Sequence, residues 1–361
     1  MSQTKPIVVI GAGLAGLACL SELSRAGLGP LLLVERHASF GTQASAQNAG
    51  LIRSHASNPH TAALARRGAR WWAQHRADLF RGQGSVLVGG DSSELMAGFR
   101  RDEHRWLHKD QLFERVGHRP SGAFRSFFNP LDGIADPQAA MQIELQNCQA
   151  AGAEIFLDCE ASLIDGELFL NGKAQDFSAV VLAAGAWSSQ LLDLPLQAFS
   201  RHLFRCLGGP LKPSSPWVWD LDEEFYFRSD GDSLLLSACD ERVVAEPDPK
   251  HWPRSNPDEW GNLRSKVARR WPSLGELELV KASAGLRCLS PDDGFILGQD
   301  PRNTGIYWCT GLGGHGVTCA QPAARLAMAT LTGASLDDEE QRLAKAHAAQ
   351  RFATLTETWN G

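Results

Sequence analysis

The chain has 361 residues, of which 35 are Lys or Arg and 41 are Asp or Glu, so its formal net charge is −6. This length allows two domains or one large domain with an insertion, and a hydrophobic content of 43% is ordinary for a globular protein. The acidic balance argues against a general attraction to nucleic acid or to an anionic membrane surface.

Membrane segments, leaders and metal sites are not expected either. No apolar run approaches the roughly 20 residues that a membrane-spanning helix needs, and the first residues lack the basic start and apolar core of a signal peptide. The eight cysteines form no CxxC pair and no metal-ligand spacing with the histidines, so neither zinc nor structural disulfides are expected. The sequence therefore predicts a cytoplasmic protein without a metal.

Residues 6–35 have the pattern of a dinucleotide-binding fold. An apolar, β-branched run predicts a buried parallel strand, and an apolar helical pattern follows the glycine-rich loop. In that loop Gly11 permits the tight turn, Gly13 lets the backbone approach a pyrophosphate, and Gly16 allows close helix–strand packing. Glu35 ends the second strand, where a carboxylate accepts hydrogen bonds from an adenosine ribose. This motif leaves NAD and FAD both open.

The remaining pieces of that fold lie further along the chain. The apolar patterns predict a helix over 138–150 and strands over 152–157, 179–185 and 306–309, the last followed by an Ala-rich helix to about residue 332. Between them, short apolar runs separated by connectors rich in Pro, Asp, Gly and Ser predict strands of an antiparallel sheet. These runs cover 86–88, 224–228, 233–237 and 277–280.

The predicted fold class is α/β, with a Rossmann-like dinucleotide-binding domain interleaved with an antiparallel-sheet α+β substrate domain. The expected dinucleotide-binding domain comprises 1–80, 150–200 and 285–361, and the substrate domain comprises 81–149 and 201–284.

Several further segments follow the N-terminal motif in a recognisable order: Ala46–Ile52 (AQNAGLI), Gly133–Pro137 (GIADP), Leu182–Ser188 (LAAGAWS), Gly285–Arg287 (GLR), Asp293–Gly298 (DGFILG) and Gly311–Gly316 (GLGGHG). Together they resemble the FAD-dependent D-amino acid oxidase, glycine oxidase and sarcosine oxidase family over nearly the whole chain. The resemblance implies FAD rather than NAD, a two-domain fold, and oxidation of a substrate C–N bond.

The resemblance also implies which residues bind FAD. The small residues of 48–50 let backbone lie against a flat isoalloxazine ring, and the helix that follows 311–316 can stabilise negative charge on a reduced flavin. The alternative for 48–50 is a plain loop, and the alternative for 311–316 is a glycine-rich loop that caps a packed helix. His315 either lies near the flavin or is structural. No covalent attachment residue stands out, so FAD is expected to be non-covalent. The predicted FAD-binding residues are Gly11, Gly13, Gly16, Glu35, Arg36, Asn48, Ala49, Gly50, Ala184, Gly185, Trp187, Gly311, Gly313, Gly314, His315 and Gly316.

Two residues are candidates for the substrate. Arg287 stands where D-amino acid and glycine oxidases have an arginine that anchors the substrate carboxylate, and a guanidinium suits that task because its planar fork makes two parallel bonds. Tyr226 lies in a strand expected to face the flavin, although a core aromatic is the equal alternative. Arg53 and Arg228 are further cations near the expected site, which suggest an acidic substrate or one with more than one anionic group; solvated surface residues are the equal alternative. The segment 293–298 lacks the family's proline, and substrate identity does not transfer.

The predicted function is a glycine-oxidase-like FAD-dependent amine or amino acid oxidase or dehydrogenase. It passes a hydride from a small carboxylate-bearing amine to flavin N5, with O₂ or another electron acceptor. Residues 285–288 and 312–324 are also similar to the oxidase domain that acts on a carboxymethylaminomethyl group of modified tRNA uridine, and basic residues at 66–70 and 100–109 keep that reading open although the acidic balance disfavours nucleic acid. A flavin-binding protein without turnover is the remaining alternative.

Overall fold

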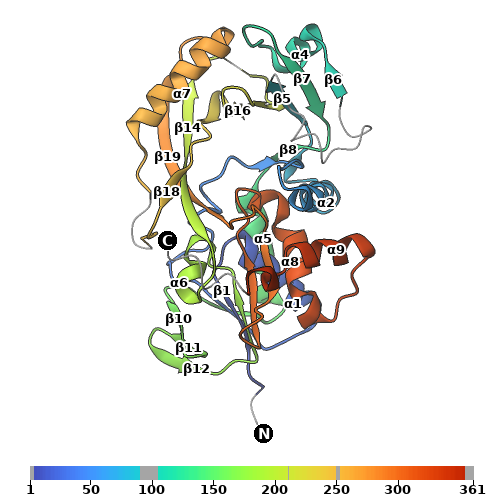
Figure 1. The fold of residues 1–361 in the computed structure, drawn as a ribbon, viewed down its shortest axis with the longest axis vertical. Helices are drawn as coiled ribbons and strands as arrows, with labels where there is room; N and C mark the ends of the chain where they lie inside the picture. The colour runs from blue at the N-terminus through green and yellow to red at the C-terminus, as the bar shows by residue number, and fades with distance from the viewer. Residues whose placement is uncertain (1–3, 90–104, 210, 249–252, 354–361) are drawn as a thin grey trace.

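The structure is a computed structural model that describes residues 4–89, 105–209, 211–248 and 253–353. The molecule has two halves, each of which combines segments from distant parts of the sequence. The first half is built on a six-stranded sheet covered on both faces (Figure 1). Five strands are parallel and the edge strand β20 is antiparallel to its neighbour β21. In spatial order the strands are β20 (Ile296–Gln299), β21 (Ile306–Thr310), β13 (Ala179–Leu182), β1 (Ile7–Ile10), β2 (Leu31–Val34) and β9 (Glu154–Phe156).

Alternate residues of these strands enter two different cores. Val9, Leu33 and Val181 pack against the helices on one face, whereas Val8 and Val180 pack on the other face with a small antiparallel sheet. Both faces are therefore buried, which explains the continuous apolar runs of the central strands. The helices are α1 (Leu14–Arg25), α2 (Pro59–His75), α5 (Pro137–Ala150) and α8 (Gly316–Thr332), and the small sheet is β10 (Ala161–Ile164), β11 (Glu167–Leu170) and β12 (Lys173–Gln175).

The second half is a nine-stranded sheet. Helices α4 (Lys109–Val116) and α7 (Pro257–Arg270) pack on one face, where Phe225, Phe227 and Trp271 belong to a further apolar core. The strands run in the order β18 (Arg242–Val244), β14 (Gln197–Leu207), β17 (Ser233–Ser237), β16 (Phe225–Asp230), β15 (Trp217–Asp220), β5 (Ser85–Gly89), β7 (Arg125–Asn129) and β6 (Arg105–Leu107), with β19 (Glu278–Leu289) paired to β14.

The α/β fold class and the strands expected in both sheets are confirmed. The second sheet is mixed rather than wholly antiparallel, because β5 pairs with β15 in parallel. More than a hundred residues separate these two strands in the sequence, so no hairpin imposes an antiparallel pairing on them. The domain boundaries stay a prediction; the one expected at residue 285 falls inside β19.

The remaining elements connect the two halves or cap them. The described helices include none with the length and apolarity to cross a membrane. The small sheet next to the first half contains β3 (Leu51–Ile52), β8 (Gly133–Ala135) and β4 (Phe80–Arg81), and the short helices are η1 (Gly185–Trp187), α6 (Ser188–Leu191), η2 (Pro272–Leu274), α9 (Asp338–Ala346) and η3 (Ala349–Phe352).

Candidate active site

A large cavity lies between the two halves. It contains about 1780 Å³ of empty space, including the part open to solvent. One wall consists of the residues that follow the carboxyl ends of β1, β2, β13 and β21, and the other is the helix-free face of the nine-stranded sheet. Ligands of open parallel sheets bind at this edge.

The N-terminal loop has the backbone that its glycines predict. Gly11 has a φ of +104°, and a Cβ there would stand 2.6 Å from the carbonyl oxygen of Ala183. A Cβ on Gly16 would stand 1.8 Å from the carbonyl oxygen of Gly11, so α1 can begin against the loop only without one. Gly11 and Gly13 line the cavity, whereas Gly16 lies behind the wall.

Glu35 is fixed at the cavity edge by backbone donors. Its Oε2 accepts from the amide of Ala12 at 2.9 Å and its Oε1 accepts from the amide of His37 at 3.0 Å. The neighbouring Arg36 places its guanidinium 5.4 Å from the ring centroid of Trp187, and burial lowers the pKa of Arg36. Ala184 and Gly185 line the same wall.

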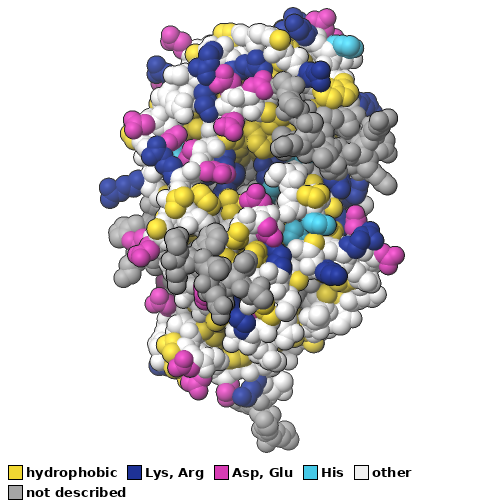
Figure 2. Space-filling model, in the orientation of Figure 1, with side chains coloured by type: hydrophobic (Ala, Val, Ile, Leu, Met, Phe, Trp, Pro, Cys, Tyr) yellow, Lys and Arg dark blue, Asp and Glu magenta, His cyan; other side chains and the backbone are white. Residues whose placement is uncertain are grey.

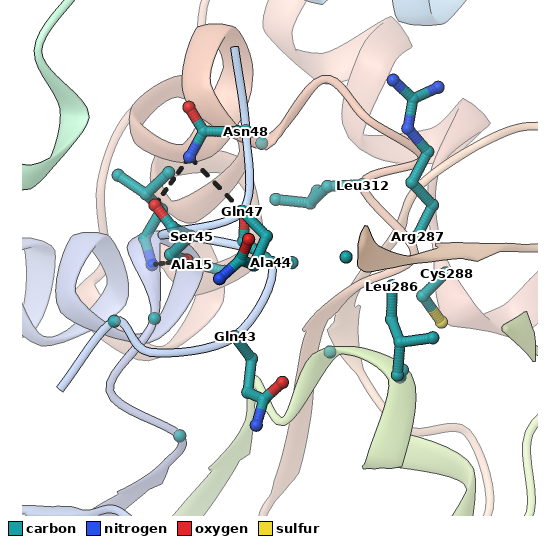
Figure 3. Close-up of a pocket in the computed structure, with 18 of the residues that line it drawn as sticks. Ala15, Gln43, Ala44, Ser45, Gln47, Asn48, Leu286, Arg287, Cys288 and Leu312 are labelled. Carbon is teal, nitrogen blue, oxygen red and sulfur yellow. Dashed lines mark hydrogen bonds between the residues drawn. The ribbon is translucent and has the colours of Figure 1, made fainter. Parts of the chain in front are cut away.

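The segment 43–50 forms a second part of this wall (Figure 3). Ser45 Oγ accepts from the amide of Leu14 at 2.9 Å, and Asn48 Nδ2 donates to the carbonyl of Ser45 at 2.6 Å. The carbonyl of Ala49 accepts from Arg228 Nε at 2.7 Å. Arg228 thus holds this loop and does not line the cavity.

The glycine-rich segment 311–316 lines the cavity at the start of α8, with one exception. Gly311, Gly313, Gly314 and Gly316 line it, but His315 is buried behind them. Its two ring nitrogens lie 3.1 and 2.7 Å from Arg53 Nη2. Burial, and then the charge of Arg53, hold the pKa of His315 well below its usual range, so the ring is neutral.

The sheet face over the cavity carries the substrate candidates. In β16 and β15, Tyr226 is directly opposite Trp219, so both point to the same face, and both line the cavity. Arg287 extends from β19 while Leu286 and Cys288 point the other way (Figure 3). No described residue makes a hydrogen bond or ion pair with the Arg287 guanidinium, which packs against Gly314.

The lining residues of this face that sequence reasoning missed include Arg201, Trp217 and Trp219. Arg201 is 9% exposed and pairs with Glu241. Residues 199–205 (FSRHLFR) do not alternate strictly between apolar and polar side chains, and no motif surrounds Arg201, so no local signal pointed to it.

Parallel strands that open on a glycine-lined cavity, closed by a second sheet, define a two-domain dinucleotide-binding protein. The family described as FAD dependent oxidoreductase matches residues 6–330. A glycine oxidase of Pseudomonas aeruginosa is 26% identical over 369 residues, covering 92% of this chain and 96% of its own. A D-amino-acid oxidase of Rubrobacter xylanophilus is 26% identical, covering 90% and 96%. Two other relatives are longer, and the chain spans 55% and 42% of their length.

Among solved structures, L-proline dehydrogenase from P. horikoshii has a TM-score of 0.81 at 17% identity, with 98% of both chains covered. This likeness concerns the fold. The match over residues 6–330 shows that the chain belongs to the FAD dependent oxidoreductase family, and FAD is therefore its cofactor.

The cavity fits FAD. Its lining includes residues that follow β1 and β2 as well as the glycines before α8, and the N-terminal end of α1, which favours a pyrophosphate, reaches its wall at Gly13 and Leu14. Glu35 lines the cavity with its carboxylate held by two backbone amides, and a carboxylate there can accept from a ribose hydroxyl. Among the described residues, no group of three or more His, Cys, Asp or Glu is arranged to hold a metal ion.

Proposed function

We propose that this enzyme oxidises a C–N bond of a small amine or amino acid that carries a carboxylate. FAD supplies the hydride acceptor when it is bound. The protein's part is to orient the substrate and stabilise charge, since arginines and aromatic rings face the cavity from the sheet. Relatives named glycine oxidase and D-amino-acid oxidase support the same substrate class.

The residues proposed to hold FAD fall into three groups. The loop before α1 and Glu35 would bind the pyrophosphate and ribose, the segment 48–50 and the residues after β13 would contact the flavin, and the glycines before α8 would stabilise negative charge on it. Gly16 and His315 would act indirectly, through α1 packing and through Arg53. Non-covalent binding of FAD and a cytoplasmic location stay predictions.

One observation carries the substrate proposal. Arg287 presents a guanidinium to the cavity that has no described partner. A charge in such a place is costly unless an anion completes it, and a carboxylate matches the guanidinium fork. Burial, and then the charge of Arg201, lower the pKa of Arg287.

The same positive charges bear on the proton of the substrate amine. A cation disfavours a second cation nearby, so the arginines lower the pKa of a bound ammonium. The amine can therefore lose its proton to water before the C–H bond breaks, and no basic side chain is required. The Tyr226 hydroxyl lies on the same face and is proposed to contact the carboxylate.

Anaerobic mixing of the holoenzyme with glycine, sarcosine and D-amino acids tests the proposal. We expect bleaching of the flavin absorbance by at least one of them. Arg287→Met should raise the half-saturating substrate concentration about 10- to 100-fold, the worth of a charged hydrogen bond. Arg205→Met is the matched control, because Arg205 lies on β14 outside the cavity and pairs with Asp230. If no amine bleaches the flavin, the protein binds FAD without turnover of this kind.

The tRNA alternative stays a prediction, supported by a relative named as a tRNA 5-methylaminomethyl-2-thiouridine biosynthesis bifunctional protein, which is 26% identical over 94% of this chain. Lys and Arg are intermixed with Asp and Glu on the face drawn in Figure 2, and Arg67 is paired with Asp337 and Glu339. Arg100 and Arg101 lie outside the described residues. A filter-binding assay with tRNA at two salt concentrations would decide it, since phosphate contacts weaken with salt.

A further inference from the structure

Two arginines lie on neighbouring strands of the sheet face that lines the cavity. Arg201 of β14 is opposite Gly285 of β19, and Phe199 is opposite Arg287. Opposite residues share a face, and residues two apart do so as well, so both arginines point into the cavity. Such diagonal neighbours are about 7–8 Å apart at Cα, and Gly285 puts no side chain beside them.

A third arginine reaches the same cavity from the other wall. Arg53 follows β3, and its guanidinium carbon lies 5.2 Å from the ring centroid of Trp219. Its Nη2 atom contacts the neutral His315 ring rather than a carboxylate. Burial, and then the charges of Arg287 and Arg201, lower the pKa of Arg53 to about 10.

The carboxylates nearby do not balance these charges. Glu241 pairs with Arg201 but its side chain is 47% exposed, and the Nε atom of Arg201 is buried without a hydrogen-bond partner. Asp132 is buried behind the wall, where it accepts from the Ser54 amide and Ser85 Oγ. Glu35 is the one acidic residue among the described residues that line the cavity, and it follows β2 at the nucleotide end.

We propose that the substrate is an amine with two anionic groups, of which Arg287 binds one and Arg201 binds the other. This rests on the proposed function and narrows it to amino dicarboxylates and amines with a carboxylate and a second acid group. Three guanidinium charges stand against the one partly exposed carboxylate of Glu241, so a single substrate carboxylate leaves one positive charge uncompensated, a cost that a second anion removes. Arg53 strengthens the positive potential between the two.

Binding of unreactive acids to the holoenzyme tests this proposal without turnover. Isothermal titration calorimetry at constant ionic strength would compare propionate with succinate and acetate with malonate. We expect each dicarboxylate to bind about 10- to 100-fold more tightly than its monocarboxylate partner, since it gains one further charged contact. An advantage below tenfold for both pairs would overturn the proposal.

Substitutions assign the two anion sites. Arg201→Met should abolish the dicarboxylate advantage and preserve propionate binding, whereas Arg287→Met should weaken both acids; Arg205→Met is the control that changes neither. Glu241→Gln removes the competing carboxylate and should tighten succinate binding several-fold. If the Arg201→Met protein keeps its FAD content but its affinities for propionate and succinate fall by the same factor, the two arginines share one carboxylate, contrary to the proposal.

The outcomes also separate this inference from the proposed function. Flavin bleaching by glycine or sarcosine, with no preference for amino dicarboxylates, would leave an amine oxidase standing and refute the two-anion substrate. Absence of bleaching by every amine, with tight succinate binding, would refute the oxidase and keep the two-anion site.

Discussion

The Arg287 side chain lies against a glycine that leaves room for it. Gly314 has a φ of +84°, and a Cβ there would stand 2.7 Å from Arg287 Cζ. The backbone of the segment 311–316, proposed to contact the flavin, and the guanidinium proposed to bind substrate therefore occupy adjoining space. The position of Arg287 depends on a residue 27 positions later in the sequence.

Gly314→Ala should therefore weaken carboxylate binding about tenfold or more, because the new methyl group displaces the guanidinium and loses a charged contact. Calorimetry with propionate measures it. Gly117→Ala is the control, since Gly117 has a φ of +81° with no atom within 4 Å of its Cβ position. Both variants carry about 1–2 kcal/mol of left-handed strain, so equal carboxylate affinities in the two would contradict the expectation.

Residue roles were only partly accessible from the sequence. The family resemblance over several segments indicates Arg287, whereas Arg228, a second candidate cation, holds a loop. Arg201 and Arg205 have the same parity on one strand, yet Arg201 enters the cavity and Arg205 pairs with Asp230 outside it. Only the position of the cavity along β14 separates the two.

At the level of elements, α1 begins where two glycines let it approach the loop. A Cβ on Gly16 would stand only 1.8 Å from the carbonyl oxygen of Gly11, so any side chain at this position must move the helix. The N-terminal end of α1 is also the proposed pyrophosphate site, so packing and cofactor binding are coupled there.

Gly16→Ala should destabilise the protein and reduce its FAD content. Gly261→Ala in α7 should stabilise the protein. Nothing lies within 4 Å of that Cβ position, and alanine is about 1 kcal/mol more favourable than glycine inside a helix. Urea unfolding and the flavin-to-protein absorbance ratio measure both. A Gly16→Ala protein as stable and as flavin-loaded as the wild type would disprove the role of this contact.

Elements with a strong apolar period were predicted, and those without one were not. The strands of the parallel sheet and helices α5 and α8 lie where the sequence indicates. The long strand β14 mixes Arg, His and Phe and was missed, and β19 extends to Leu289 rather than ending near 280. The pairing of these two strands over the cavity is a long-range contact, and the residues of neither strand alone indicate it.

At the scale of the whole molecule, the last described segment is tied back to the first sheet. His347 is fully buried; its Nδ1 accepts from the amide of Phe295 at 3.1 Å and its carbonyl accepts from the amide of Leu297 at 2.9 Å. Burial, and then the charge of Arg351, lower the pKa of His347 to about 4. The imidazole is therefore neutral in the folded protein at neutral pH.

Stability should fall as the pH drops from about 6.5 to about 4. In this range the unfolded chain binds a proton on His347 that the folded protein does not, so acid favours unfolding. The full effect is on the order of 3 kcal/mol, and above pH 6.5 it is absent. Urea unfolding at pH 7.5, 5.5 and 4.5 measures it, and His347→Gln should flatten the curve. Identical pH dependence in wild type and variant would exclude His347 as the cause.

The sequence by itself indicated a dinucleotide and the class of fold, because the glycines, the acidic residue after β2 and the apolar runs are local patterns with direct backbone consequences. The resemblance of the later segments to one family then narrowed the dinucleotide to FAD. The tertiary structure decided which side chains meet over the cavity. Arg53, Arg201 and Arg287 come from segments far apart in the chain, and they share one enclosed space only because β14 pairs with β19 and that sheet closes over the carboxyl ends of the parallel strands.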